Sequence, residues 1–352
     1  MNVLSPHASK TLEAPLPSTG ALRFKSALLL CKIWSGDATM AIYFFKPSRH
    51  AADEITSLFG FVWPTAAALW NLRWQVAGYL DAVPDASVKE LNDRFVTGSR
   101  LVGADLRGAC VETPWDDQRA RFASIILTSA FAIYESWADE IIAELGLQLK
   151  GKRFQFPDSQ ATGGNDLESM IASLVATPSV TLSSAYFPLY ACGPKYNLAI
   201  LPNLLLAYRY FKEIRNSEMH LGGIADAKAE AAYLALKPVS AKTLLGMKGE
   251  LMIEPAVDGQ PVRLHLRGVV GFSDILLRII ATVDAELSRT IQAERAFRRD
   301  LAAVKNAPAM YSGTDRRGLQ QTSSRCVKAG YPKPLDAEAV YAFLRRESLV
   351  RV

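Results

Sequence analysis

The sequence predicts a mainly α-helical protein: a helical bundle with a small β-hairpin inserted in it and further helices on its N-terminal side. Hydrophobic residues make up 49% of the 352 residues, which is enough for a sizeable core. Several long segments repeat apolar residues at intervals of three or four, the period of an α-helix. One segment, 237–268, instead places apolar runs on both sides of the turn sequence DGQP, a pattern that favours a β-hairpin.

Length and composition suit two domains, or one domain with large extensions. The Pro- and Ser-containing start of the chain is expected to be disordered, and it shows no signal-peptide pattern. The predicted parts are a disordered lead (1–20), a mostly helical N-terminal region of unknown role (21–110), the helical bundle with its hairpin (111–305) and a basic C-terminal tail with a short helix (306–352).

The N-terminal region is ambiguous at first and then helical. Residues 21–48 suit two short strands or a strand and a helix, because their periodicity does not decide between them. A helix follows over 51–82, interrupted at Pro64, and a shorter one over 85–95.

Residues 55–72 carry no charge, which leaves two interpretations. They approach the lower length limit of a membrane-spanning helix, but their polar residues and central Pro64 favour a buried, kinked core helix, so no membrane contact is predicted. On the same reasoning the tryptophans at helical spacing are expected in the core and not as base-stacking platforms: Trp63, Trp70, Trp74 and Trp137.

A stronger helix begins at the sequence TPWDD. Thr113 suits the N-cap, Pro114 suits the first helical position, and the two aspartates place negative charge in the first turn. Apolar residues then advance by three or four up to residue 145, and Gly146 is a natural stop.

Beyond this helix the pattern alternates between loops and helices. A polar loop is predicted over 150–165, and an irregular connection over 177–196. Helices are predicted for DLESMIASLVA, for the segment from Pro202 to Asn216, for ADAKAEAAYLALK, for 272–305 as one long helix, and for the C-terminal segment that begins near Asp336.

Charge and cysteine content narrow the function classes. The four cysteines are far apart, with no metal-ligand spacing to a histidine, so neither a structural zinc site nor a disulfide framework is predicted, and a reducing cytoplasm is expected. No phosphate-binding glycine loop or serine-hydrolase elbow occurs, and no cofactor is predicted. Residues 295–352 hold 12 basic and 5 acidic residues, a balance of +7, which suits either a polyanion such as RNA or a solvated helix surface.

The segment FKEIRNSEMHLGG, residues 211–223, carries the most specific chemistry. It places Arg215 and Asn216 ahead of His220, one of only four histidines, at the end of a helix. A guanidinium binds phosphate by two parallel hydrogen bonds, and an imidazole transfers protons near neutral pH. Together these groups suit RNA cleavage without a metal: the histidine acts as acid or base, and the arginine stabilises the phosphorane.

Here the chain resembles the HEPN superfamily, whose members are helical bundles with an Arg-x4–6-His motif, often with Asn directly after the Arg. The matching residues are Arg215, Asn216 and His220. An earlier helix adds AFAIYESWADEII, in which Glu135 and Asp139 lie one turn apart and match an acidic pattern of many members. The resemblance covers about residues 115–290, and the hairpin at 237–268 departs from a minimal bundle.

The resemblance implies a metal-independent endoribonuclease that works as a homodimer, with two Arg/His motifs meeting across the interface. Arg215 would bind the phosphate, His220 would be the general acid or base, Asn216 would orient them, and Glu135 would support them. Many members are toxins or effectors of prokaryotic defence systems, which implies an antitoxin or sensor protein as partner. Other members are non-catalytic RNA-binding or dimerisation modules, and that alternative stays open.

Each of these residues also has a plain structural interpretation. Arg215 can complement the helix C-terminus, His220 can cap it, and Glu135 and Asp139 can be solvated. RNA contacts beyond the motif are expected from four arginines: Arg263 and Arg267, which the hairpin would place on one strand face with His265, and Arg316 and Arg317 in the basic tail. A solvated strand edge is the alternative for the first two.

Overall fold

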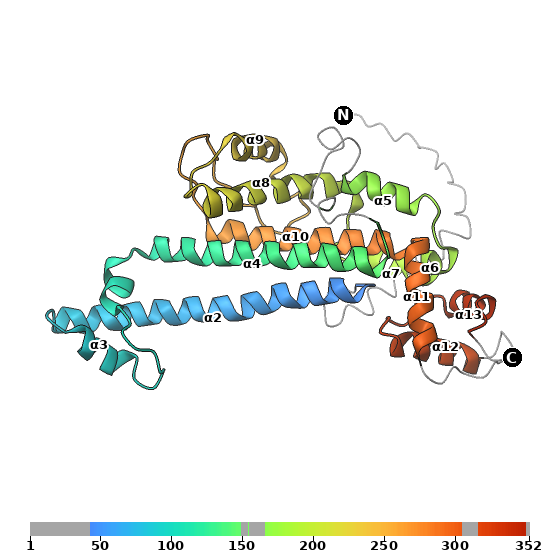
Figure 1. Ribbon diagram of the computed structural model, residues 1–352, viewed down its shortest axis with the longest axis horizontal. Coiled ribbons are helices and arrows are strands. Elements are labelled where there is room, and N and C mark those ends of the chain that lie inside the picture. Colours follow the sequence, from blue (N-terminus) through green and yellow to red (C-terminus); the bar gives the residue numbers. More distant parts are fainter. Residues whose placement is uncertain (1–42, 149–153, 155–165, 305–315, 350–352) are drawn as a thin grey trace, which may run out of the picture. The chain divides into compact units, whose positions relative to one another are not determined.

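The computed structural model describes residues 43–148, 154, 166–304 and 316–349, all within one compact unit, Ala41–Val352. The expected disordered lead and the ambiguous segment up to residue 42 therefore lie outside the described residues. Within this unit four long helices lie side by side (Figure 1): α2 (Lys46–Ala82), α4 (Trp115–Glu144), α8 (Leu201–His220) and α10 (Leu266–Ser288). The expectation of a mainly α-helical bundle is confirmed.

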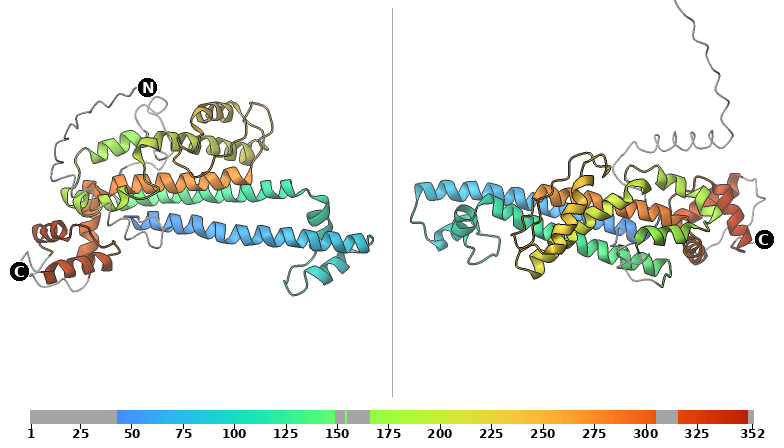
Figure 2. Two further views of the ribbon diagram at one scale, coloured as in Figure 1. Left: turned by 180° about the vertical axis from the view of Figure 1, so that it is seen from behind. Right: turned by 90° about the horizontal axis from the view of Figure 1, so that it is seen from above.

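Shorter helices connect and flank these four, and Figure 2 shows them from two further sides. They are α3 (Val88–Phe95), the π-helix η2 (Gly108–Glu112), α5 (Leu167–Val175), α6 (Val180–Ala185), α7 (Phe187–Ala191), the 3₁₀ turns η4 (Leu198–Ile200) and η5 (Lys237–Val239), α9 (Ala227–Leu236), α11 (Ile291–Ala303), α12 (Arg316–Lys328) and α13 (Ala337–Arg346).

Aromatic side chains fill the centre, where α4, α8 and α10 meet. Phe131 of α4 lies 5.2 Å from Tyr208 of α8 and 5.0 Å from Phe272 of α10, measured between ring centroids. Phe211 stacks on Phe272 at 4.6 Å. These buried rings fix how α8 lies against α4, and they do so one helical turn before Arg215 and Glu135.

The start of α2 is anchored by a buried carboxylate of α10. Asp284 accepts hydrogen bonds from the backbone N–H groups of Phe44, at 2.6 Å, and Phe45, at 3.1 Å. Phe45 is the N-cap residue of α2, so Asp284 satisfies donors that the first turn of the helix leaves unpaired. Burial raises the pKa of Asp284 to about 6, against hydrogen bonds from Ser48 and the two N–H groups that lower it.

The predicted β-hairpin is wrong. Segment 237–268 begins with the 3₁₀ turn η5, continues as turns and extended chain, and reaches the first turn of α10 at Leu266; no strand is described there. The turn at DGQP does form, with Gln260 N–H donating to Val257, but its flanks pair with the chain after α8: Ala225 N–H donates to Gln260 and Val262 N–H to Gly223. The chain after α8 therefore takes the place of the second strand that a hairpin would need.

Other helix boundaries also differ from expectation. The predicted helix 272–305 is two helices, because the Thr290 hydroxyl accepts from Ala293 N–H and starts α11 afresh. The connection predicted to be irregular contains α6 and α7, and the basic tail contains α12 in addition to the one short helix predicted there, α13. Cys110 and Cys326 are buried free thiols, whereas Cys192 is disulfide-bonded, which the cysteine spacing did not lead us to expect.

Three of the four tryptophans expected in the core are exposed on α2. Trp137 is buried, but Trp63, Trp70 and Trp74 are 43%, 40% and 66% exposed. Pro64 lies inside α2, which continues through it. Among the described residues α2 is also a helix long and apolar enough to cross a membrane, by length and composition only, and 11% of its most apolar window is buried.

Candidate functional site at the end of helix α8

The Arg-Asn-x3-His motif occupies the last two turns of α8. The helix extends to His220, four residues beyond the predicted end at Asn216. Gly222 and Gly223 follow with φ of 63° and 80°, and Gly223 N–H donates back to the Ser217 carbonyl. This left-handed ending stops the helix directly after the histidine.

Arg215 lies between α8 and α4. Its Nη1 is 3.8 Å from Oε1 of Glu135, and its Cζ is 5.2 Å from the centroid of the Phe131 ring. The Arg215 side chain is only 22% exposed, and its buried Nε has no hydrogen-bond partner among the described residues. A partly buried guanidinium whose ion pair is as long as 3.8 Å retains hydrogen-bonding capacity for an anion at its terminal N–H groups.

Glu135 is the partner that the resemblance implied for Arg215. It is 39% exposed and reaches α8 from the turn after Phe131. Asp139 lies one turn further along α4 and is exposed. The structure therefore brings Glu135, but not Asp139, into contact with the motif.

Asn216 belongs to a polar stripe on the neighbouring face of α8. Its Nδ2 donates to Oε2 of Glu213 at 3.2 Å, and buried Glu213 forms an ion pair of 2.7 Å with Arg209. Residues 209, 213, 216 and 220 recur at intervals of three and four, so the stripe ends at His220.

His220 is exposed and faces away from Arg215. Five residues along an α-helix correspond to a rotation of about 140°, so the two side chains leave α8 in different directions. The described residues show no contact between them.

Three polar groups near Arg215 were not singled out by sequence reasoning as site residues. The Tyr208 hydroxyl is buried without a hydrogen-bond partner among the described residues, and burial, with the charge of Glu135, raises its pKa. Burial, with the charge of Arg209, lowers the pKa of Lys212. The Ser217 hydroxyl is buried and unpaired within the described chain. Tyr208, Lys212 and Arg215 share one face of α8 at intervals of four and three. This spacing is the sequence pattern from which Tyr208 and Lys212 could have been predicted to lie near Arg215.

The four arginines expected to contact RNA are all exposed, but they do not form the predicted arrangement. Arg263 lies in extended chain before α10, and Arg267 lies in the first turn of that helix, where His265 is the N-cap. The expected strand face that would align them is therefore absent from this described segment.

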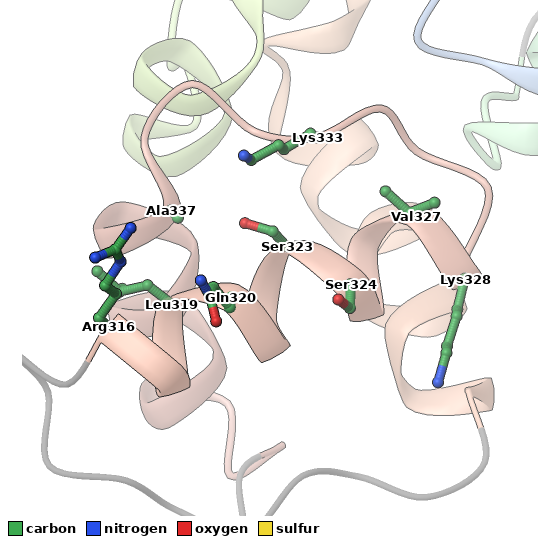
Figure 3. A pocket seen from close by; sticks show the side chains of 9 residues that line it. All are labelled: Arg316, Leu319, Gln320, Ser323, Ser324, Val327, Lys328, Lys333 and Ala337. Atoms are coloured by element: carbon green, nitrogen blue, oxygen red, sulfur yellow. The ribbon is translucent and has the colours of Figure 1, made fainter.

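Arg316 and Arg317 begin α12, and Arg316 lines a shallow pocket of about 830 Å³ between α12 and α13. Figure 3 shows its lining, in which the Lys333 and Ser323 side chains point to the same side, that of Ala337, beside which Arg316 lies. Lys328 is the third cation, and no carboxylate is among the lining residues. This composition suits a phosphate-bearing ligand.

No group of three or more His, Cys, Asp or Glu side chains that could hold a metal ion occurs in the described part of the chain. Comparisons with protein-family models, with curated proteins and with solved structures give no match for this chain.

Proposed function

We propose that the protein is a metal-independent endoribonuclease of the HEPN type, with its chemistry at the end of α8. The observation that carries the proposal is the contact between Arg215 and Glu135, 3.8 Å across α8 and α4. A motif arginine supported by an acidic residue of an earlier helix is the pairing that the family resemblance implies.

The proposed reaction cleaves the RNA backbone, and each motif residue has a part in it. The ribose 2′-oxygen attacks the phosphorus and loses its proton to a base, the P–O5′ bond breaks, and an acid protonates the departing 5′-oxygen. The products are a 2′,3′-cyclic phosphate and a 5′-hydroxyl. His220 serves as the acid or the base, because an imidazole exchanges protons near neutral pH. Arg215 holds the phosphate and stabilises the charge of the phosphorane.

Asn216 and Glu135 have supporting roles in this proposal. The Asn216 amide lies on the stripe that ends at His220 and is held by Glu213, so it is placed to orient the histidine or the phosphate. Glu135 holds the Arg215 side chain against α4.

A second copy of the chain completes the proposed site. Arg215 and His220 leave α8 about 140° apart, so one phosphate does not reach both groups in one copy. A homodimer in which two α8 ends face each other would supply the arginine from one copy and the histidine from the other.

A non-catalytic module for RNA binding or dimerisation is the second candidate. The observation that favours it is the exposure of His220 and its separation from Arg215 within the chain. In that case the α12–α13 pocket and Arg215 bind RNA without cleaving it.

In the cell we place the enzyme in the cytoplasm as a toxin or effector of a prokaryotic defence or toxin–antitoxin system. Its partners are RNA and an antitoxin or sensor protein. This role rests on the resemblance and on the basic C-terminal segment of the sequence.

The test is to incubate the purified full chain with total tRNA and a labelled single-stranded RNA in EDTA. Wild-type protein is expected to produce 2′,3′-cyclic phosphate ends, whereas Arg215→Ala and His220→Ala are not. His265→Ala is the matched control, because His265 is the N-cap of α10 and not a residue of the motif. Equal cleavage by wild type and both motif variants would end the proposal, and RNA binding without cleavage would favour the second candidate.

A further inference from the structure

The exposed side of α2 is an uncharged aromatic surface. From Ile55 to Leu80 the only charged residue is Arg73. Its Nη1 is directed inward, to the carbonyls of Ala109 at 2.9 Å and Thr113 at 2.8 Å and to Oε1 of Gln118 at 2.9 Å. These 26 residues span about 39 Å of helix. Over that length Arg73 is the one charged side chain of α2, and it is only partly exposed.

The aromatic residues form one stripe, which contacts α4 at the first residue of that helix, where Trp70 lies 5.1 Å from Trp115. The buried positions of α2 recur on one side of the helix: Ile55 and Val62 belong to the core shared with α4, whereas Val76 and Leu80 pack with residues of α3 and η2. The tryptophans Trp63, Trp70 and Trp74 lie about 100° around the helix from them. Their exposure of 40–66% leaves on the order of 100 Å² of each indole in water. Soluble monomers rarely expose contiguous apolar patches larger than a few hundred Å².

This stripe alternates large and small residues. Phe59 and Trp63 form one aromatic pair and Trp70 and Trp74 another, each with ring centroids 5.8 Å apart. The pairs are 11 residues apart, close to three full turns. Exposed Gly60 and Ala67 lie on the same side, and a Cβ added at Gly60 would meet nothing within 4 Å. Aromatic ridges beside open glycine positions are what interlocking helices need.

We propose that a second copy of this chain packs antiparallel along α2, with the two-fold axis near Ala67. This register places Trp74 of one copy over Gly60 of the other, and the same contact repeats across the axis. A two-fold interface must be self-complementary in this way. An uncharged surface also meets its own copy without charge repulsion.

The local charge argues against a lipid surface as the occupant. Residues 55–121, which include α2 beyond Ile55 and its neighbours, contain 7 basic and 8 acidic residues. Trp115, 5.1 Å from Trp70, is followed directly by exposed Asp116 and Asp117. Interfacial helices bind anionic membranes through excess Lys and Arg, which this surface lacks.

The size of the surface predicts a reversible dimer. A strip about 39 Å long and 10–12 Å wide amounts to roughly 400–500 Å² per copy. Stable interfaces bury about 800 Å² per partner, so this contact lies at the lower end. The interface is also separate from the end of α8, because α2 and α8 both contact α4 and are drawn on opposite sides of it (Figure 1). The proposal is therefore independent of the ribonuclease function.

The experiment uses sedimentation velocity of the full chain over a range of concentrations. Wild type is expected to associate through α2 with rising concentration, and Trp74→Lys is expected to lose this association step while keeping any dimer that forms through the α8 ends. Phe61→Lys is the matched control, because Phe61 is 67% exposed on the same helix but lies about 140° around it from Trp74. The control variant should dimerise like wild type.

Cross-linking fixes the register. Ala67→Cys, next to the axis, should form an oxidised dimer, whereas Phe61→Cys should not. Flotation with vesicles of phosphatidylcholine and phosphatidylglycerol tests the lipid alternative. Monomers at every concentration, equal loss of dimers in the Phe61 control, or Trp74-dependent flotation would each overturn the proposal.

Discussion

Nη1 of Arg215 on α8 lies 3.8 Å from Oε1 of Glu135 on α4. The same guanidinium lies over the Phe131 ring, with Cζ 5.2 Å from the ring centroid. Eighty residues of sequence separate the two side chains. The contact is too long for a strong hydrogen bond, so it orients the guanidinium but leaves its terminal N–H donors available. A group held in this way can exchange its partner for a phosphate.

Glu135→Gln should lower RNA cleavage at least tenfold while changing the free energy of unfolding by less than about 1 kcal/mol. The pair is partly exposed, so it contributes little to stability, but it positions the arginine. Single-turnover cleavage rates and urea denaturation measure the two effects. Glu140→Gln is the matched control, because Glu140 is exposed on the same helix and bonds only Ser136 among the described residues. Equal losses in both variants would contradict the assignment.

Arg215→Lys keeps the charge but removes the planar fork. We expect it to bind RNA nearly as well as wild type and to cleave it at least tenfold more slowly, because lysine cannot bind phosphate by two parallel hydrogen bonds. RNA affinity and cleavage rate, measured on the same substrate, separate the two properties. Full cleavage by the lysine variant would show that only the charge matters.

Lys333→Glu should weaken RNA binding about equally for all sequences and reduce its dependence on salt. Lys333 lines the α12–α13 pocket with two other cations and no carboxylate, so its loss removes a phosphate contact. Fluorescence anisotropy at several salt concentrations measures the RNA affinity and its dependence on salt. Lys248→Glu makes the same charge change at an exposed position away from the pocket, and its affinity should stay close to wild type. A matching loss there would mean that only net charge matters.

Asp284→Asn should alter how stability depends on pH. The folded pKa of Asp284 is about 6, above its ordinary value of 3.8, so the folded protein holds an extra proton between these values. The wild-type free energy of unfolding should therefore fall by about 3 kcal/mol from this group as pH rises from about 4 to above 6. Asparagine does not titrate, so this decline should be missing from the variant. Urea denaturation of both proteins at several pH values measures this difference. If the free energy of unfolding depends on pH in the same way in wild type and variant, Asp284 is not the titrating group.

Gly268→Ala should destabilise the fold by about 1–3 kcal/mol, because a Cβ there would lie 2.2 Å from the Met252 carbonyl oxygen. Gly249→Ala is the control, since a Cβ at Gly249 meets nothing within 4 Å. Urea denaturation of both variants measures the difference. Equal stability would mean that the extended chain over Met252 yields easily.

Helices with one apolar stripe and clear ends could be predicted from the sequence. The helix predicted from Pro114 is α4, Trp115–Glu144, but its N-cap is Pro114 and not the predicted Thr113, and no side chain caps it. The helix predicted after Asp336 is α13, with the Asp336 side chain accepting from Ala339 N–H. The start of α8 was also confirmed. In these elements local propensity and packing agree, so the pattern is sufficient.

The errors arose where the outcome depends on distant partners. α2 has two apolar stripes, and periodicity does not say that only one of them is covered; hence Trp63, Trp70 and Trp74 were wrongly placed in the core. The DGQP turn was correct, but its pairing with residues 223–225 is set by tertiary contacts. At the site, the motif is local and visible, whereas the direction of His220 depends on α8 continuing past Asn216.

The bond from Phe44 N–H to Asp284 joins positions 240 residues apart. During synthesis at about 5–20 residues per second, α2 leaves the ribosome roughly 10–50 s before the carboxylate that anchors it exists. During that interval α2, with its tryptophans, has neither the Asp284 carboxylate that binds its start nor helix α10 to pack against. A nascent chain with this order of events is a natural client for a chaperone that binds uncharged aromatic segments, and its yield should depend on how fast the last third is translated.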